Sequence, residues 1–228
     1  MPASSPLHTW DLSLAEARSL QERLAGELHF PLQKAGFRWA AGADVAFHSS
    51  SNRIVAAVVL VDGKSGAVAE ECHVVREATF PYIPGYLSFR EAPAVLEACS
   101  LLGRLPEVLL LDGQGLAHPR RFGLACHLGL WLGIPTIGCA KSRLVGDFIS
   151  PGPDPGSWTD LTDKGEKVGA VLRTRKKVKP LFISPGHLLP LPLCIRTVLD
   201  FCRGFRLPEP TRQAHLLVTR LRRTLGPR

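Results

Sequence analysis

Two short, continuously apolar runs constrain the fold of this chain more than any other feature. They are VLLLD at residues 108–112 and IPTIGCA at residues 134–140, and a segment with helical spacing at residues 121–132 separates them. Strands that are apolar at every position are typical of parallel sheets buried on both faces. The sequence therefore predicts a strand, a helix and a second strand inside a covered sheet.

Three apolar, β-prone runs precede this unit and predict an antiparallel meander. Residues 37–47 and 54–62 are joined by the polar HSSSNR, and the Asp-Gly pair at 62–63 begins a tight reversal into residues 67–80. The expected sheet thus starts with three sequential strands.

Helices are expected on either side of the meander. Residues 10–28 have apolar positions at helical spacing, and Ser13 and Glu16 are placed as a capping box. Residues 88–102 also have a helical pattern, with Pro93 in the first turn or at a kink. Three antiparallel strands, a helix, a strand, a helix and a strand match a ribonuclease H-like mixed sheet flanked by helices, which is an α/β fold.

The rest of the chain is interpreted as part of one domain covering residues 1–228. Residues 150–167 are predicted to be a loop insertion. Their first part, SPGPDPG at residues 150–156, is interpreted as an insertion rather than a domain boundary, because the segment after it is too short and strand-poor to build its own core. Residues 168–183 suggest a hairpin, and two helices within residues 192–228 end the chain.

Composition limits the class of protein. The net charge of +8 and a pI near 9.5 permit an anionic partner, although charge alone does not establish one. No apolar stretch is long enough to cross a bilayer and the N-terminus lacks a signal pattern, so we expect a soluble, cytoplasmic and monomeric protein without membrane contact. The six cysteines are scattered without a CxxC pair, which favours buried free thiols over a zinc site.

Three acidic residues are placed where a site is expected. Asp44 lies inside the apolar AAGADVAF, where a carboxylate is costly to bury unless it is paired or bound to a cation. Asp112 ends the run VLLLD, and open α/β sheets place their sites at the carboxyl ends of strands. If these two strands are neighbours, the two aspartates meet, and Glu91 at the start of the next helix reaches the same point.

Oxygen donors without clustered cysteines suit a hard divalent cation, Mg²⁺ or in its place Mn²⁺. Such a cation would support phosphoryl transfer by preparing a water and neutralising charge on a phosphodiester. Taken singly, each acid has another interpretation: Asp44 and Asp112 as strand-end caps or turn formers, and Glu91 as a first-turn helix acid.

The segment PYIPGYLSFRE at residues 81–91 holds an aromatic between two prolines. Pro81 and Pro84 restrict the backbone on both sides of Tyr82 and Ile83, so the aromatic stands on a stiff projection. Beside a metal site on a basic protein, such a projection is suited to enter a base stack. The alternative is a proline-rich connector whose tyrosine covers the core.

Basic residues follow the two apolar strands. In GQGLAHPRRFG, His118 is a candidate to orient a water or phosphate or else a helix-capping residue, and Arg120 and Arg121 are candidates to hold phosphate, one of them being only solvated. Lys141 in GCAKS is expected at the same sheet end, where it would bind the scissile phosphate. His215, taken alone, is interpreted as a helix-surface histidine.

The segment RTRKKVK at residues 173–179 is expected to be a basic strand. As a phosphate-binding edge it would give binding a steep salt dependence, and as a solvated edge that blocks aggregation it would not.

Five motifs together resemble the endonuclease V family, which nicks nucleic acid near deaminated adenine. They are GADVAF, PYIPGYLSFRE, LLLDGQGLAHPRRFG, GCAKSRLVG and EPTRQAH, and the resemblance covers residues 15 to 220. It implies a ribonuclease H-like fold and hydrolysis of the second phosphodiester 3′ to inosine, leaving 3′-hydroxyl and 5′-phosphate ends in DNA repair. Gln114 departs from the family pattern, because many members carry a histidine there.

The resemblance also implies roles for individual residues. The metal site would be Asp44, Glu91 and Asp112, and the catalytic set would add Lys141, His118 and His215. The implied strand-separating wedge is Pro81, Tyr82, Ile83 and Pro84; the implied base pocket is Gly85, Leu87, Gly113, Leu124 and Leu144; the phosphate-binding candidates are Arg90, Arg120, Arg175, Lys176 and Lys177.

Three hypotheses stay open. The first is a Mg²⁺-dependent endonuclease acting on inosine-containing DNA, with inosine-containing RNA as another substrate. The second is a structure-specific nuclease of the same fold that recognises flaps or junctions. The third is a nucleic-acid-binding protein that keeps the fold without turnover.

Overall fold

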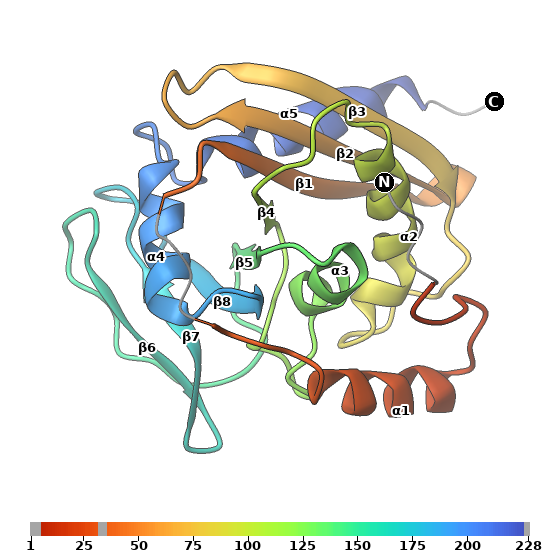
Figure 1. Cartoon of the computed structure of the whole chain (residues 1–228), viewed down its shortest axis with the longest axis horizontal. Coiled ribbons are helices and arrows are strands. Elements are labelled where there is room, and N and C mark those ends of the chain that lie inside the picture. Colours follow the sequence, from red (N-terminus) through yellow and green to blue (C-terminus); the bar gives the residue numbers. More distant parts are fainter. Residues whose placement is uncertain (1–5, 32–35, 226–228) are drawn as a thin grey trace.

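The computed structural model describes residues 6–31 and 36–225, which form a mixed eight-stranded sheet with helices on both faces (Figure 1). The strands are β1 (Trp39–His48), β2 (Arg53–Asp62), β3 (Val68–Glu77), β4 (Val108–Leu111), β5 (Thr136–Ala140), β6 (Trp158–Asp163), β7 (Glu166–Leu172) and β8 (Leu181–His187). The helices are α1 (Leu14–Ala25), α2 (Leu87–Ser100), α3 (Leu124–Leu132), α4 (Leu191–Asp200) and α5 (Glu209–Thr224).

The strand order is β3-β2-β1-β4-β5-β8-β7-β6. Strands β1, β4 and β5 run parallel, and the remaining pairs are antiparallel. The predicted meander, the two buried parallel strands and the flanking helices are therefore confirmed. In the parallel pairing of β1 with β4, Ala43 lies opposite Leu111, so Asp44 and Asp112 come next on adjacent strands.

Strand β2 shows why its sequence is apolar without alternation. One set of its side chains packs towards α2 and the other towards α5; these are Ile54, Ala56, Val58 and Leu60 on the first side and Val55, Ala57, Val59 and Val61 on the second. Because helices cover both faces, neither set meets solvent.

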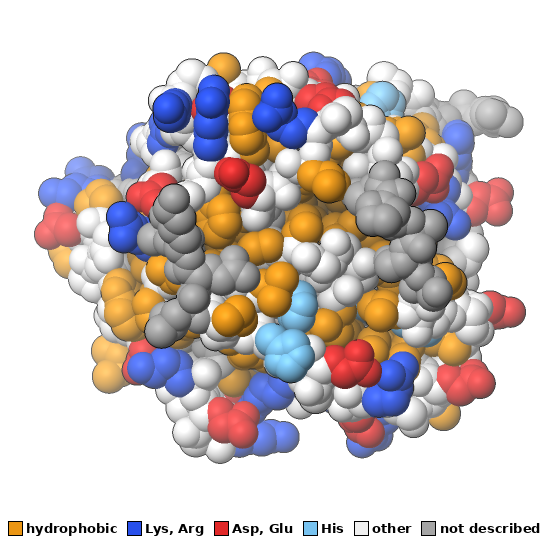
Figure 2. Space-filling model, viewed as in Figure 1, with side chains coloured by type: hydrophobic (Ala, Val, Ile, Leu, Met, Phe, Trp, Pro, Cys, Tyr) orange, Lys and Arg blue, Asp and Glu red, His pale blue; other side chains and the backbone are white. Residues whose placement is uncertain are grey.

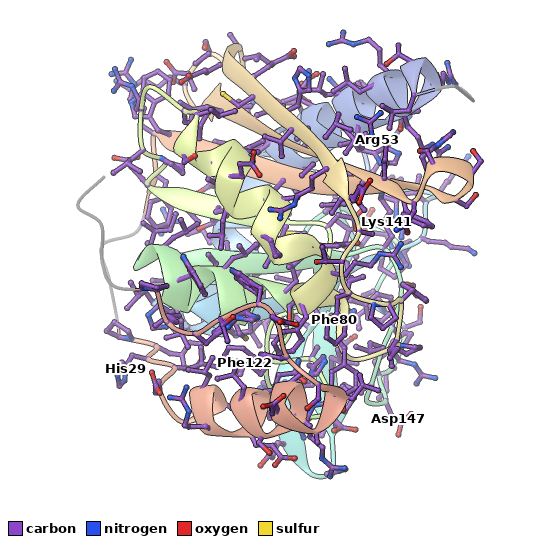
Figure 3. The ribbon with its side chains drawn as sticks, turned by 90° about the vertical axis from the view of Figure 1, so that its right-hand side faces the viewer. His29, Arg53, Phe80, Phe122, Lys141 and Asp147 are labelled. Carbon is purple, nitrogen blue, oxygen red and sulfur yellow. The ribbon has the colours of Figure 1, made fainter. Side chains whose placement is uncertain are left out.

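Helix α1 adds a layer outside α2 and α3. Its capping box is present, with Ser13 accepting from the Glu16 amide and the Glu16 carboxylate accepting from the Ser13 amide. Ala17 packs against Phe80, and Leu24 packs against Phe122 (Figure 3). Across the described residues, no helix has both the length and the apolar character that a bilayer crossing requires.

Two local predictions were wrong, and a third is narrowed to one of its alternatives. The region predicted as a loop insertion contains β6, whose sequence WTDLTD is polar because it is an edge strand in which only Leu161 is buried. The basic segment 173–179 is the connection between β7 and β8 rather than a strand, and Lys177 adopts a positive φ of 59° within it. Pro93 lies inside α2 rather than in its first turn, so of the two predicted placements the kink stays a prediction.

Helix α5 packs very closely on β1 at Gly42. A Cβ atom added there would lie 2.0 Å from the Pro210 carbonyl carbon and 2.3 Å from the Thr211 nitrogen. The absence of a side chain at this position therefore sets how near α5 lies to the sheet.

We predict that Gly42→Ala lowers the free energy of unfolding by about 1–3 kcal/mol or more, because the backbone of α5 must move away from β1. Urea unfolding measures the loss. The control is Gly26→Ala, whose new Cβ would meet only the Arg23 carbonyl oxygen, at 3.5 Å. Equal stability of the two variants would show that a Cβ atom at residue 42 does not displace the backbone of α5.

Candidate active site

Two carboxylates and a histidine converge where the parallel pairing of β1 with β4 ends. Asp44 and Asp112 each follow the last paired residues of the parallel strands, and His215 comes from α5. One ligand atom from each of the three lies within 4.8 Å of the others. The prediction that the two aspartates meet is confirmed by this geometry.

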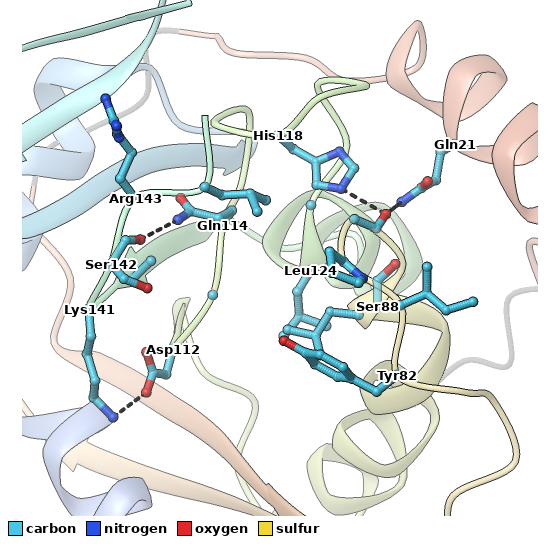
Figure 4. A pocket seen from close by; sticks show the side chains of 18 residues that line it. Gln21, Tyr82, Ser88, Asp112, Gln114, His118, Leu124, Lys141, Ser142 and Arg143 are labelled. Atoms are coloured by element: carbon cyan, nitrogen blue, oxygen red, sulfur yellow. Dashed lines mark hydrogen bonds and ion pairs between the residues drawn. The ribbon is translucent and has the colours of Figure 1, made fainter. Parts of the chain in front are cut away.

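Positive and polar groups contact both aspartates. Lys141, just after β5, forms an ion pair with Asp112 (Figure 4) and lies 3.2 Å from His215 Nδ1. His215 Nδ1 lies 2.7 Å from Asp44 Oδ2. Lys141 is thus at the predicted sheet end, and His215 is not a surface residue without contacts. We refer to Asp44, Asp112, Lys141 and His215 as the acid cluster.

The charges of Asp44 and Asp112 affect the pKa of Glu91, which lies in α2. Burial, followed by the charges of Asp44 and Asp112, raises the pKa of Glu91 to about 8. Burial and the Asp112 charge also raise the pKa of Asp44, against the opposing hydrogen bond from His215. Glu91 and Asp44, whose ionised forms are disfavoured by burial and by the Asp112 charge, fit a site for a cation that would relieve the repulsion.

The donor set differs from the predicted one in one member. The sequence predicted Asp44, Glu91 and Asp112, whereas the three side chains whose ligand atoms cluster are Asp44, Asp112 and His215. Carboxylate oxygens suit Mg²⁺ or Mn²⁺, and an imidazole nitrogen is a common ligand of several divalent metals. Both sets leave Asp44 and Asp112 as the shared members.

A pocket of about 350 Å³ opens beside the acid cluster (Figure 4). The segment Tyr82–Gly85 lies on one side of it, and Lys141 to Leu144 lie on the other. Asp112 belongs both to the pocket lining and to the acid cluster. All five residues of the predicted base pocket line it, namely Gly85, Leu87, Gly113, Leu124 and Leu144.

The proline-flanked aromatic projects from the surface. Tyr82 is 68% exposed, so it does not cover the core. The chain turns directly after it, with the Tyr86 amide donating to the Ile83 carbonyl. Gly85 has a φ of 82° and follows Pro84, as in a type II turn, so this turn needs a glycine.

The carbonyl of Gly85 is held by three side chains. Gln21 Nε2, His118 Nε2 and Arg120 Nη2 donate to it at 3.2, 2.9 and 2.5 Å. The Arg120 guanidinium also lies 4.3 Å from the centre of the Tyr86 ring. His118 and Arg120, predicted to act on water or phosphate, therefore fix the wall of the pocket.

Gln21 was not predicted to take part. Its signal in the sequence is a polar residue on the buried stripe of α1, four residues after Ala17 and three before Leu24. It donates to Gly85 and Phe122 and accepts from Arg120. These three bonds join α1 to the wall of the pocket.

The other arginines near the site have protein partners. The buried Arg90 guanidinium lies 3.9 Å from the centre of the Phe47 ring and 6.0 Å from that of Tyr82. Arg121 pairs with Asp163 and Glu166, each at 2.8 Å. Arg90 thus links the aromatic projection to the end of β1, while Arg121 ties the loop after β4 to the β6–β7 hairpin.

The remaining phosphate-binding candidates lie on the turn between β7 and β8. Arg175, Lys176 and Lys177 are exposed, and Lys176 pairs with Asp154 at 2.8 Å. Basic and acidic side chains are interspersed over the face of the molecule in Figure 2. Net charge alone therefore does not identify a nucleic-acid surface.

Comparisons with known proteins agree with this architecture. The model of the endonuclease V family matches residues 18–216. An endonuclease V of Geotalea uraniireducens is 47% identical over 93% of this chain and 90% of its own length. The crystal structure of the Streptomyces avermitilis endonuclease V has a TM-score of 0.90 at 40% identity, covering 95% of this chain and 96% of its own.

A complex of a related protein has also been solved. The endonuclease V of Ciona intestinalis, bound to a 24mer DNA containing an inosine followed by a ribo-adenosine, has a TM-score of 0.81 and 26% identity. The alignment covers 93% of this chain and 99% of that one.

We predict a pH-dependent contribution of His118 to stability. Burial, followed by the Arg120 charge, lowers the pKa of His118 from 6.5 to about 4, so its ring is neutral and its Nδ1 accepts from the Arg120 amide. Because the unfolded chain binds this proton more readily, the contribution is present above pH 6.5 and is lost as the pH falls towards 4.

Urea unfolding from pH 7 to 4 should therefore show a smaller loss of stability for His118→Gln than for the parent, by about 1–3 kcal/mol. The control is His73→Gln, on the edge strand β3. Parallel pH profiles of parent and His118→Gln would refute the assignment of a neutral His118.

Proposed function

The chain belongs to the endonuclease V family, and on that basis we propose that it is a metal-dependent endonuclease that recognises inosine in nucleic acid. It hydrolyses the second phosphodiester bond 3′ to the inosine and leaves 3′-hydroxyl and 5′-phosphate ends. The observation that carries this proposal is that Asp112 belongs to both the pocket and the acid cluster. A base in the pocket therefore has its backbone near the carboxylates.

Each part of the site has a task in this reaction. Tyr82, on its stiff turn, enters the base stack and helps to turn the inosine out of the strand. The pocket then holds the base, and glycines at 85 and 113 let the backbone approach it closely. Extrusion is less costly for an inosine pair, which is weaker than a normal one.

The acid cluster acts on the phosphodiester. Asp44, Asp112 and Glu91, with His215 beside them, would hold Mg²⁺, or Mn²⁺ in its place. The ion would prepare a water and neutralise charge on the phosphate. Lys141 lies against Asp112 and can move to a phosphate oxygen, where its ammonium acts as a point charge.

DNA containing inosine is the proposed substrate, supported by the complex of the related Ciona protein. In that complex a ribonucleotide follows the inosine, which favours inosine-containing RNA as a second candidate substrate. Parallel cleavage of inosine-containing DNA and RNA of one sequence separates the two.

We predict that Asp44→Asn and Asp112→Asn each slow cleavage of an inosine-containing strand by at least about a hundredfold. Each carboxylate would bind the metal ion directly, and loss of such a ligand slows the reaction more than loss of a side chain that only orients a ligand. Single-turnover cleavage with added Mg²⁺ measures the rates. The control is Asp160→Asn, an exposed aspartate paired with Lys167 on the β6–β7 hairpin. Parent-like rates for both variants would refute the metal assignment.

We predict that Tyr82→Ala lowers cleavage of duplex substrates about tenfold more than cleavage of single strands, because only a duplex requires unstacking and strand separation. The comparison uses one inosine-containing strand, alone and annealed. Tyr82→Phe keeps the ring and should cleave both forms at the parent's rates. Equal losses on both forms would contradict a wedge role for Tyr82.

A further inference from the structure

Two polar side chains of the pocket have an atom without a partner among the described residues. They are Ser88 Oγ, in the first turn of α2, and Gln114 Oε1, in the loop after β4. Both residues line the pocket, and they lie on opposite sides of it in Figure 4. Ser88 is only 2% exposed.

Buried polar atoms without partners are rare, because each loses the hydrogen bonds that water would provide. Leaving one unpaired costs about 1–3 kcal/mol of stability. Two such atoms in the wall of one pocket are therefore explained by a bound molecule that completes their hydrogen bonds.

The hydrogen bonding of Gln114 defines what this molecule must offer. Gln114 Nε2 donates to the Ser142 carbonyl at 2.9 Å, which fixes the orientation of the amide (Figure 4). The atom left over is the carbonyl oxygen Oε1, and a carbonyl oxygen only accepts. The partner of Gln114 must therefore be a donor, whereas the Ser88 hydroxyl can donate to an acceptor.

We propose, building on the function above, that Gln114 and Ser88 are specificity-determining residues that hydrogen-bond the edge of the extruded base. In inosine the base has one N–H donor, the N1–H group. This group donates to Gln114 Oε1. The Ser88 hydroxyl donates to O6, the acceptor that replaces the 6-amino group of adenine and that nebularine lacks.

This pairing discriminates against adenine. Deamination turns N1 from an unprotonated acceptor into a donor and replaces the 6-amino group with a carbonyl. Adenine N1 facing Gln114 would place two acceptors together and leave both unpaired. A site built to hydrogen-bond a group rejects an analogue that lacks it far more strongly than an apolar pocket does.

The test compares inosine with nebularine, a purine nucleoside without the 6-oxygen and the N1–H group. The full chain and its variants cleave single-stranded DNA that carries either base, under single-turnover conditions. Ser88→Ala and Gln114→Met should each slow cleavage at inosine about tenfold and leave cleavage at nebularine within about twofold of the parent, narrowing the preference for inosine. The control is Ser100→Ala in the same helix, whose exposed hydroxyl donates to the Glu97 carbonyl.

Stability supplies a second measurement. Removal of an unpaired buried hydroxyl should leave the urea midpoint of Ser88→Ala unchanged or higher, whereas a structural hydroxyl would lower it. Variants that keep the parent's ratio of inosine to nebularine cleavage would overturn the inference and leave the proposed function intact. If the parent cleaves inosine- and adenine-containing strands equally, both the proposed function and the inference fail.

Discussion

The parallel pairing of β1 with β4 is the constraint on which the site depends. It sets Asp44 and Asp112 side by side just beyond the last paired residues, Ala43 and Leu111, which are apolar and buried. Burial, followed by the charge of Asp112, raises the pKa of Asp44. Lys141 and His215 offset part of this rise, and the covered sheet holds all four in place.

A different set of contacts positions the pocket, which shares Asp112 with the acid cluster. Gln21, His118 and Arg120 hold the Gly85 carbonyl, so the wall that carries Tyr82 is fixed by bonds to α1 and to the loop after β4. The pocket and the acid cluster therefore depend on the same strand end. Such preorganisation limits the conformational entropy lost when a ligand is bound.

The sequence predicted the parts of the fold that rest on local pattern. Continuous apolar strands and a capping box identify the sheet and α1, and an aspartate within an apolar strand marks the site. Contacts between residues far apart in the sequence left weaker signals in the sequence pattern. His215 reaches Asp44 only because Gly42 lets α5 pack closely on β1, and Gln21 appears in the sequence only as a polar residue on an apolar stripe. Strand β6 was missed because an exposed edge strand has little apolar pattern.

The two halves of the site place opposite electrostatic demands on a ligand. The acid cluster is rich in carboxylates, so an approaching phosphate is repelled unless a cation or Lys141 neutralises the charge. On the side of the pocket opposite Lys141, burial and the Arg120 charge hold His118 in its uncharged form. A nucleotide has a neutral base and an anionic backbone. The base carries no charge that the carboxylates would repel, so its binding free energy can offset the cost of bringing the phosphate to them.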